Sequence, residues 1–89
     1  MNAPYLEVTF RRGRPLAAYL YLPRAAGEKS VRTQRVEPGM VVDFARTGLP
    51  IGIEITAPGM ITADDVNRLL EDLGLAPVAE SDLAPLRAA

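Results

Sequence analysis

Five short segments of the chain alternate between apolar and other residues with the period of two that is typical of β-strands. The predicted strands are residues 5–10, 16–22, 31–36, 40–45 and 51–56. The last is the clearest, because isoleucine stands at positions 51, 53 and 55 and smaller or polar residues stand between them. The segment 31–36, VRTQRV, is the most polar. Alternation of this kind predicts an antiparallel sheet with one face turned toward a core.

Glycine and proline punctuate these segments at positions where a tight turn needs them. Residues 11–15, 37–39 and 46–50 are expected to be turns, and residues 23–30 a longer polar loop. Several strands at short, regular spacing predict a meander, in which consecutive strands lie side by side.

A helical pattern follows the last strand. Thr62 is a suitable N-cap, acidic residues follow in the first turn, and Gly74 is a typical helix stop. The apolar positions between these signals keep helical spacing and are Val66, Leu69, Leu70 and Leu73. We therefore expect a helix over 62–73, then an Ala/Pro-rich tail, 75–89, in which residues 81–83 can begin another helical turn. The prediction is one α+β domain over 1–89, with an antiparallel β-meander of four to five strands over 5–56 and one C-terminal helix packed on one face.

The second predicted strand, LAAYLYL, is apolar or amphipathic on both faces. One helix covers only one face of a sheet, so Tyr19, Tyr21 and Val41 are expected on the open face. Exposed apolar patches mark interaction surfaces, and tyrosine is enriched in interface centres. We predict an interface at these three residues, formed with a second copy of the chain (a homodimer or larger homo-oligomer) or with a small partner protein.

The amino-acid composition excludes several kinds of catalytic and metal site. The chain has no cysteine, histidine or tryptophan, so neither a Ser-His-Asp or Cys-His catalytic site nor a zinc site with His or Cys ligands can be built. No phosphate-cradling glycine motif is present. Two carboxylates, Asp43 and Glu54, lie on neighbouring predicted strands and could hold Mg²⁺, but pairing with Arg32 or Arg35, or exposure to water, is the better explanation. We therefore predict that the protein is not an enzyme and binds no cofactor and no metal ion.

The charge is unevenly distributed, although the net charge is only −1. Residues 1–46 hold eight basic and four acidic residues, whereas residues 47–89 hold two basic and seven acidic ones. The candidate contacts for an anion or a nucleic acid are Arg11, Arg12, Arg14, Arg32 and Arg35. The alternative function is therefore a nucleic-acid-binding regulatory protein that uses the turn at 11–14. The sequence pI of about 5.3 argues against it, because nucleic-acid-binding domains are usually basic.

Two segments together resemble a known family. The first is LAAYLYL, and the second is the hairpin VVDFARTGLPIGIEI over 41–55. They are similar to the short bacterial proteins of the domain of unknown function 2283 family, and the likeness covers about residues 5–60. Pro50 and the loop at 23–30 depart from the family pattern. The resemblance implies the fold and a bacterial origin, transfers no catalytic residues, and implies an antitoxin-like role beside a small toxin-like neighbour.

The expected location is the cytoplasm, away from membranes. A chain without cysteine suits a reducing compartment. Its first ten residues, MNAPYLEVTF, lack the basic start and apolar run of a secretory signal, and no apolar stretch approaches the length of a membrane span.

Overall fold

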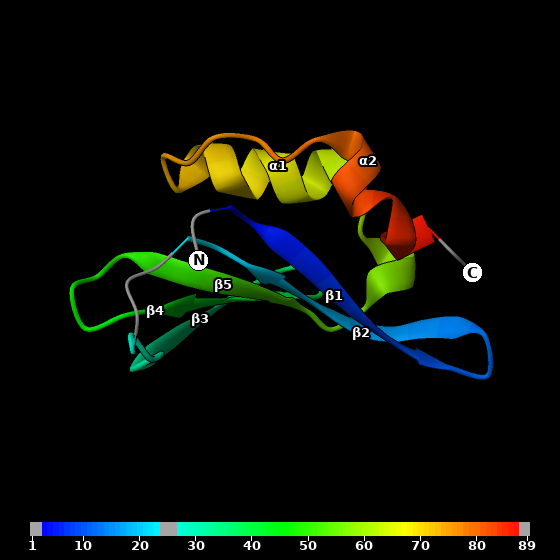
Figure 1. Ribbon diagram of the computed structural model, residues 1–89, viewed down its shortest axis with the longest axis horizontal. Helices are drawn as coiled ribbons and strands as arrows, with labels where there is room; N and C mark the ends of the chain where they lie inside the picture. Colours follow the sequence, from blue (N-terminus) through cyan, green and yellow to red (C-terminus); the bar gives the residue numbers. More distant parts are fainter. Residues whose placement is uncertain (1–2, 24–26, 88–89) are drawn as a thin grey trace.

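The computed structural model describes residues 3–23 and 27–87. Over these residues it shows one antiparallel sheet with helical segments on one of its faces (Figure 1). The strands are β1 (Tyr5–Arg11), β2 (Arg14–Tyr21), β3 (Arg32–Val36), β4 (Met40–Phe44) and β5 (Pro50–Ile55). The helical segments are η1 (Pro58–Met60), α1 (Ala63–Asp72), α2 (Glu80–Leu83) and η2 (Ala84–Arg87). The predicted α+β class, with an antiparallel sheet and a helix on one face, is confirmed.

The strand order is β1-β2-β5-β4-β3. Consecutive strands lie side by side within β1–β2 and within β3–β4–β5, as in the predicted meander. Between these two groups the prediction fails, because β5 rather than β3 lies beside β2. The cause is visible in the burial of the two strands. Ile53 and Ile55 of β5 are both fully buried, whereas residues 32–35 of β3 are all exposed. A strand as polar as β3 is stable at an edge, where its side chains reach water, and the apolar β5 takes the centre.

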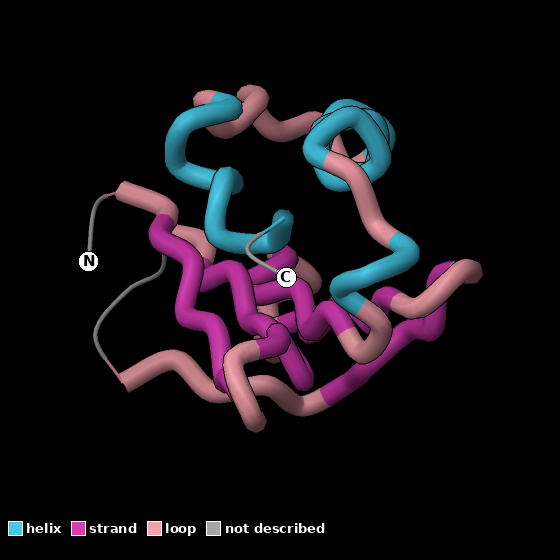
Figure 2. Tube along the Cα trace, turned by 90° about the vertical axis from the view of Figure 1, so that its right-hand side faces the viewer, coloured by secondary structure: helices cyan, strands magenta, loops and turns pink. Residues whose placement is uncertain are grey.

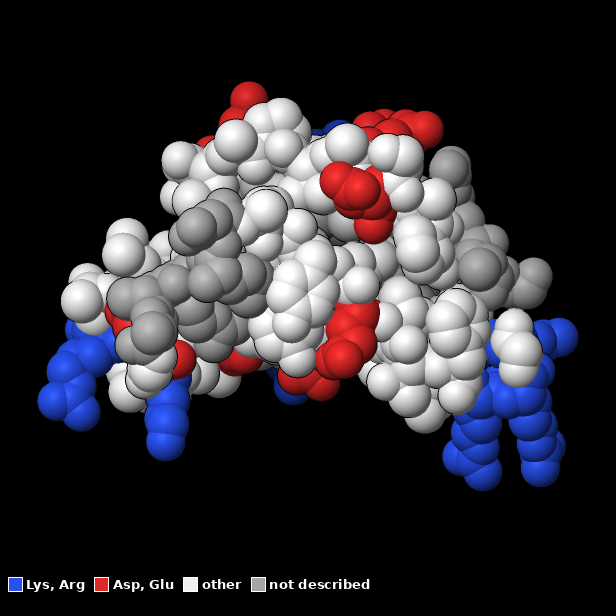
Figure 3. All heavy atoms as spheres, in the orientation of Figure 1, with Lys and Arg blue, Asp and Glu red and all other residues white. Residues whose placement is uncertain are grey.

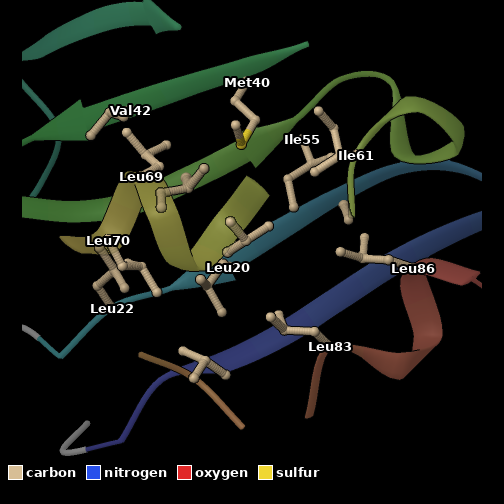
Figure 4. Close-up of a cluster of buried hydrophobic side chains, with 14 of the residues drawn as sticks. Leu20, Leu22, Met40, Val42, Ile55, Ile61, Leu69, Leu70, Leu83 and Leu86 are labelled. Atoms are coloured by element: carbon tan, nitrogen blue, oxygen red, sulfur yellow. The ribbon is translucent and has the colours of Figure 1, made fainter. Parts of the chain in front are cut away.

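The core lies between the sheet and the helical layer (Figure 4). Leu20 from β2, Val42 from β4 and Ile55 from β5 point from the sheet toward Leu69 and Leu70 of α1. The tail continues this layer, because its buried apolar side chains belong to the same cluster; they are Val78, Leu83 and Leu86. The helical cover therefore consists of α1 together with α2 and η2, and α2 includes the helical turn expected at residues 81–83.

Helix α1 begins at a reciprocal capping box. The Thr62 hydroxyl accepts a hydrogen bond from the Asp65 backbone N–H at 3.1 Å, and the Asp65 carboxylate accepts one from the Thr62 N–H at 2.9 Å. At the other end Gly74 has φ +77°, and the Leu75 N–H bonds the Leu70 carbonyl at 2.8 Å. The helix ends there, which turns the tail back along the same layer.

The β1–β2 hairpin is longer than the sheet that supports it. Its turn is Arg12-Gly13, with φ of 54° and 78°, the conformation of a type I′ turn. Strand β5 pairs with β2 only between Ala18 and Tyr21. The tip of the hairpin therefore extends past β5 (Figure 1).

Candidate functional site on the open face of the sheet

The face of the sheet opposite the helical layer is here called the open face. Figure 2 shows the helical segments on one side of the strands. Cross-strand register puts two rows of side chains on the open face, each running from β1 to β3. The first row is Glu7, Tyr19, Glu54, Val41 and Arg35, and the second is Tyr5, Tyr21, Gly52, Asp43 and Thr33. The predicted interface residues Tyr19, Tyr21 and Val41 thus share this face.

Three tyrosines form a continuous cluster at the β1–β2 side of the open face. The rings of Tyr5 and Tyr21 stack with centroids 4.5 Å apart and planes inclined by 17°. The rings of Tyr21 and Tyr19 meet edge to face, with centroids 4.7 Å apart and an angle of 65°. Both arrangements are favoured aromatic geometries. Tyr5 remains 49% exposed at the sheet edge, so the cluster presents aromatic surface to the outside.

Two carboxylates of the open face hold the tyrosine hydroxyls. Tyr19 Oη donates to Asp43 Oδ2 at 2.7 Å, and Tyr21 Oη donates to Glu7 Oε1 at 3.1 Å. The Tyr19 phenol crosses β5 at Gly52, where an added Cβ would overlap the ring and its oxygen. The glycine is therefore needed for close approach of a side chain, and these contacts orient both rings.

Asp43 and Glu54 share the open face, as the hypothesis of a carboxylate pair requires, but they are diagonal neighbours and do not lie directly opposite each other. In the β4–β5 register Asp43 lies opposite Gly52, and Glu54 lies opposite Val41. A hairpin centred on Thr47-Gly48 gives this same pairing, and the register shifts only nearer the turn, between Asp43 and Phe44. Among the described residues, no group of three or more His, Cys, Asp or Glu side chains could hold a metal ion.

Of the two arginines considered as partners for these carboxylates, Arg32 does not share their face. Arg32 lies opposite Phe44 in the β3–β4 register, on the face that carries the core. Its guanidinium sits 4.1 Å from the centroid of the Phe44 ring, a cation–π contact at the edge of the core. Arg35 is three residues further along β3, so it lies on the opposite face, in the open-face row next to Val41.

The structure does not bring the five candidate arginines together. Arg11, Arg12 and Arg14 are exposed at the tip of the β1–β2 hairpin, whereas Arg32 and Arg35 belong to the opposite edge strand. Figure 3 shows basic side chains at both ends of the molecule, with acidic side chains between them on the side away from the helices. The three hairpin arginines form one basic group, and it is separate from the other two.

Tyr5 and Gly52 belong to the site but were not among the predicted site residues. A hairpin that closes on Arg12-Gly13 without irregularity would place Tyr5 opposite Leu20. The bulge between Thr9 and Phe10 shifts the pairing by one residue, so Tyr5 faces Tyr21 instead. A β-bulge moves a side chain to a different partner. The signal for it is that Leu6 and Val8 share the core face with Leu20 and Ala18 only if one residue is added to a hairpin that closes on Arg12-Gly13.

None of the helices in the described part of the chain combines the length and the apolar character that crossing a membrane requires. No protein-family model, curated protein or solved structure matches the chain, so the resemblance to the domain of unknown function 2283 family stays a prediction.

Proposed function

We propose that this chain is a non-enzymatic interaction protein whose open sheet face binds another protein, most simply a second copy of itself. The observation that supports the proposal is the one-sided architecture. The described helices pack on one face of the sheet, while the tyrosine cluster and Val41 lie on the other. Tyr5 is about half exposed there. Aromatic surface of this kind is typical of protein interfaces.

The chemistry of the open face supports binding rather than catalysis. The carboxylates of Asp43 and Glu7 accept hydrogen bonds from tyrosine hydroxyls, which fixes the rings in place before a partner arrives. Rings that are already ordered lose little conformational entropy on binding, so such a surface binds more tightly than a mobile one. A domain of 89 residues has a thin core, and burying this face against a partner would add to its stability.

The occupant could also be a different small protein. The family resemblance implies an antitoxin-like role, in which the open face would bind the product of a neighbouring gene. The absence of cysteine supports a cytoplasmic setting for either form of the proposal.

Light scattering of the purified protein tests the proposal. We expect a mass above the 9.6 kDa of one chain, and we expect Val41→Lys to lower that mass because it places a charge on the open face. Leu49→Lys is the matched control, since Leu49 is 60% exposed in the β4–β5 turn, away from the tyrosines. If the wild-type chain is monomeric at every concentration, and titration with the neighbouring gene product gives no binding, the proposal is wrong.

A further inference from the structure

The open face carries the groups that recognise a guanidinium. Three acidic side chains, Glu7, Asp43 and Glu54, lie in the same two rows as the tyrosine rings. Arginine stacks on aromatic rings and donates to carboxylates at the same time. A carboxylate oxygen that accepts one hydrogen bond from tyrosine still has lone pairs for an arginine donor. The face is therefore suited to a narrow, arginine-bearing segment.

The same chain presents such a segment at its other end. The tip of the β1–β2 hairpin carries Arg11, Arg12 and Arg14, all exposed. Beside them Phe10 is 48% exposed and Leu16 is 52% exposed. The tip lies beyond the last residue of β2 that pairs with β5, and its turn is only two residues wide. Basic side chains at this end reach away from the helical layer, on the same side as the open face (Figure 3).

We infer that the occupant of the open face is the β1–β2 hairpin tip of a second copy of this chain. This inference rests on the proposed function and names the partner. The hairpin is continuous with its own sheet, so it cannot fold back onto its own open face. In a two-fold dimer each tip would reach the partner's tyrosine cluster, and both contacts would form together. Arginines would then meet the acidic rows, while Phe10 and Leu16 would add apolar contact.

A second copy fits these charges better than a nucleic acid does. Both could contact the hairpin arginines. Phosphates on that side of the molecule would also approach Glu7, Asp43 and Glu54, and the chain has a net charge of −1. A second copy carries both signs of charge and places each against its opposite.

A charge-swap experiment tests this dimer. The hairpin variant is Arg11→Glu with Arg14→Glu, which leaves the Arg12-Gly13 turn intact, and the face variant is Glu54→Arg. We expect each variant alone to raise the dimer dissociation constant about tenfold or more, because like charges then meet in both contacts. An equimolar mixture of the two should dimerise again, since the reversed tip then meets the reversed position 54 and the unchanged tip meets the unchanged face. The wild-type dimer should also weaken as salt rises from about 50 to 500 mM.

The controls place the same charge changes on the helical layer. Arg68→Glu and Glu71→Arg change exposed positions of α1, and neither should alter the dissociation constant. Circular dichroism and thermal melts establish that each variant is folded. The competing hypothesis is that the hairpin binds a nucleic acid. Fluorescence anisotropy at low salt, with a labelled DNA duplex and a labelled single strand, tests it.

The outcomes separate this inference from the proposed function. If the wild-type protein self-associates, loses mass with Val41→Lys but keeps its dissociation constant in both charge variants, the open face is the interface and the hairpin is not its occupant. If DNA binds and only the hairpin variant loses it, while self-association is unchanged, a polyanion is the hairpin's partner and the inference is wrong. A monomeric wild-type chain overturns the inference directly.

Discussion

Tyr19 on β2 and Asp43 on β4 are joined by a 2.7 Å hydrogen bond, although β5 lies between their strands. The phenol crosses β5 where residue 52 has no side chain. The three central strands of the sheet are thus linked by a side-chain contact in addition to their backbone ladder. This contact also fixes the orientation of the ring at the centre of the proposed interface.

Gly52→Ala should displace Tyr19, because a Cβ at position 52 would overlap the phenol. Overpacking of this kind typically lowers the free energy of unfolding by about 1–3 kcal/mol. The same substitution in a Tyr19→Ala background should cost much less, since the ring is gone. Urea unfolding of the four proteins of this double-mutant cycle measures the coupling. An equal cost in both backgrounds would show that the two residues do not interact.

Tyr19→Phe removes the donor and leaves the ring over Gly52. We expect the free energy of unfolding to fall by about 1 kcal/mol, the usual net contribution of one hydrogen bond. Asp43→Asn should cost less, because the amide oxygen still accepts from Tyr19 Oη. Denaturant melts of both single variants check the order. A larger loss for Asp43→Asn than for Tyr19→Phe would indicate that Asp43 has a stronger partner than the tyrosine.

The elements of the fold are predictable from local signals. Alternation locates the strands, Thr62 and Gly74 delimit α1, and Arg12-Gly13 is a recognisable hairpin turn. The order of the strands in the sheet cannot be predicted from local signals, because β2 and β5 are far apart in the chain. Their pairing depends on which strands are apolar enough to lie in the centre of the sheet. The polarity of β3 was the available signal, since a strand with residues 32–35 exposed suits an edge.

The sequence predicts part of the candidate site. The part that it does not predict depends on the pairing register of the strands. The placement of Tyr19, Tyr21 and Val41 on one face follows from alternation within each strand. The partners of the tyrosines on β1 depend on the bulge near Thr9. A change of one residue in pairing moves every later partner, so the stacking of Tyr5 on Tyr21 depends on the extra residue near Thr9. The offset of Asp43 from Glu54 follows directly from a turn centred on Thr47-Gly48.

Leu83 joins the tail to the core and is only 1% exposed. Leu83→Ala should lower the free energy of unfolding by about 2–5 kcal/mol, because it removes buried methyl groups and leaves a cavity. Leu49→Ala, at a side chain that is 60% exposed, is the matched control and should change stability by less than about 0.5 kcal/mol. Thermal and urea melts distinguish the two. Similar small losses at both positions would mean that the tail does not pack as described.

The capping box of α1 makes part of the free energy of unfolding depend on pH. Hydrogen bonds from the backbone and side chain of Thr62 hold the pKa of Asp65 below its ordinary value of 3.8. A carboxyl with a lowered folded pKa stabilises the protein above its unfolded pKa, and this contribution is lost as pH falls through the folded value. Asp65→Asn should therefore lower the melting temperature at neutral pH but not at strongly acidic pH. A difference that persists unchanged in acid would contradict the assignment.

Asn67 on α1 binds the tail in both directions and offers the most specific test of its attachment. Its Oδ1 accepts from the Val78 N–H at 2.8 Å, and its Nδ2 donates to the Val78 carbonyl at 3.0 Å. Val78 is buried, so its backbone groups would lose partners without this side chain. Asn67→Ala should cost about 1–3 kcal/mol for the unsatisfied groups and should speed amide exchange at Val78.

Asn67→Asp separates the two hydrogen bonds. An ionised aspartate can still accept from the Val78 N–H, but it cannot donate to the Val78 carbonyl, which it would repel. The carbonyl therefore disfavours the charged form and should raise the folded pKa of the new carboxyl above its unfolded value. The loss of stability relative to wild type is then full above the folded pKa, shrinks as pH falls from the folded pKa to the unfolded pKa, and is smallest below the unfolded pKa, because the protonated acid can donate again. Urea melts from neutral to acidic pH should show the Asp variant approaching wild type, with Asn67→Ala as the pH-independent reference. A deficit of Asn67→Asp that grows in acid would contradict the paired geometry.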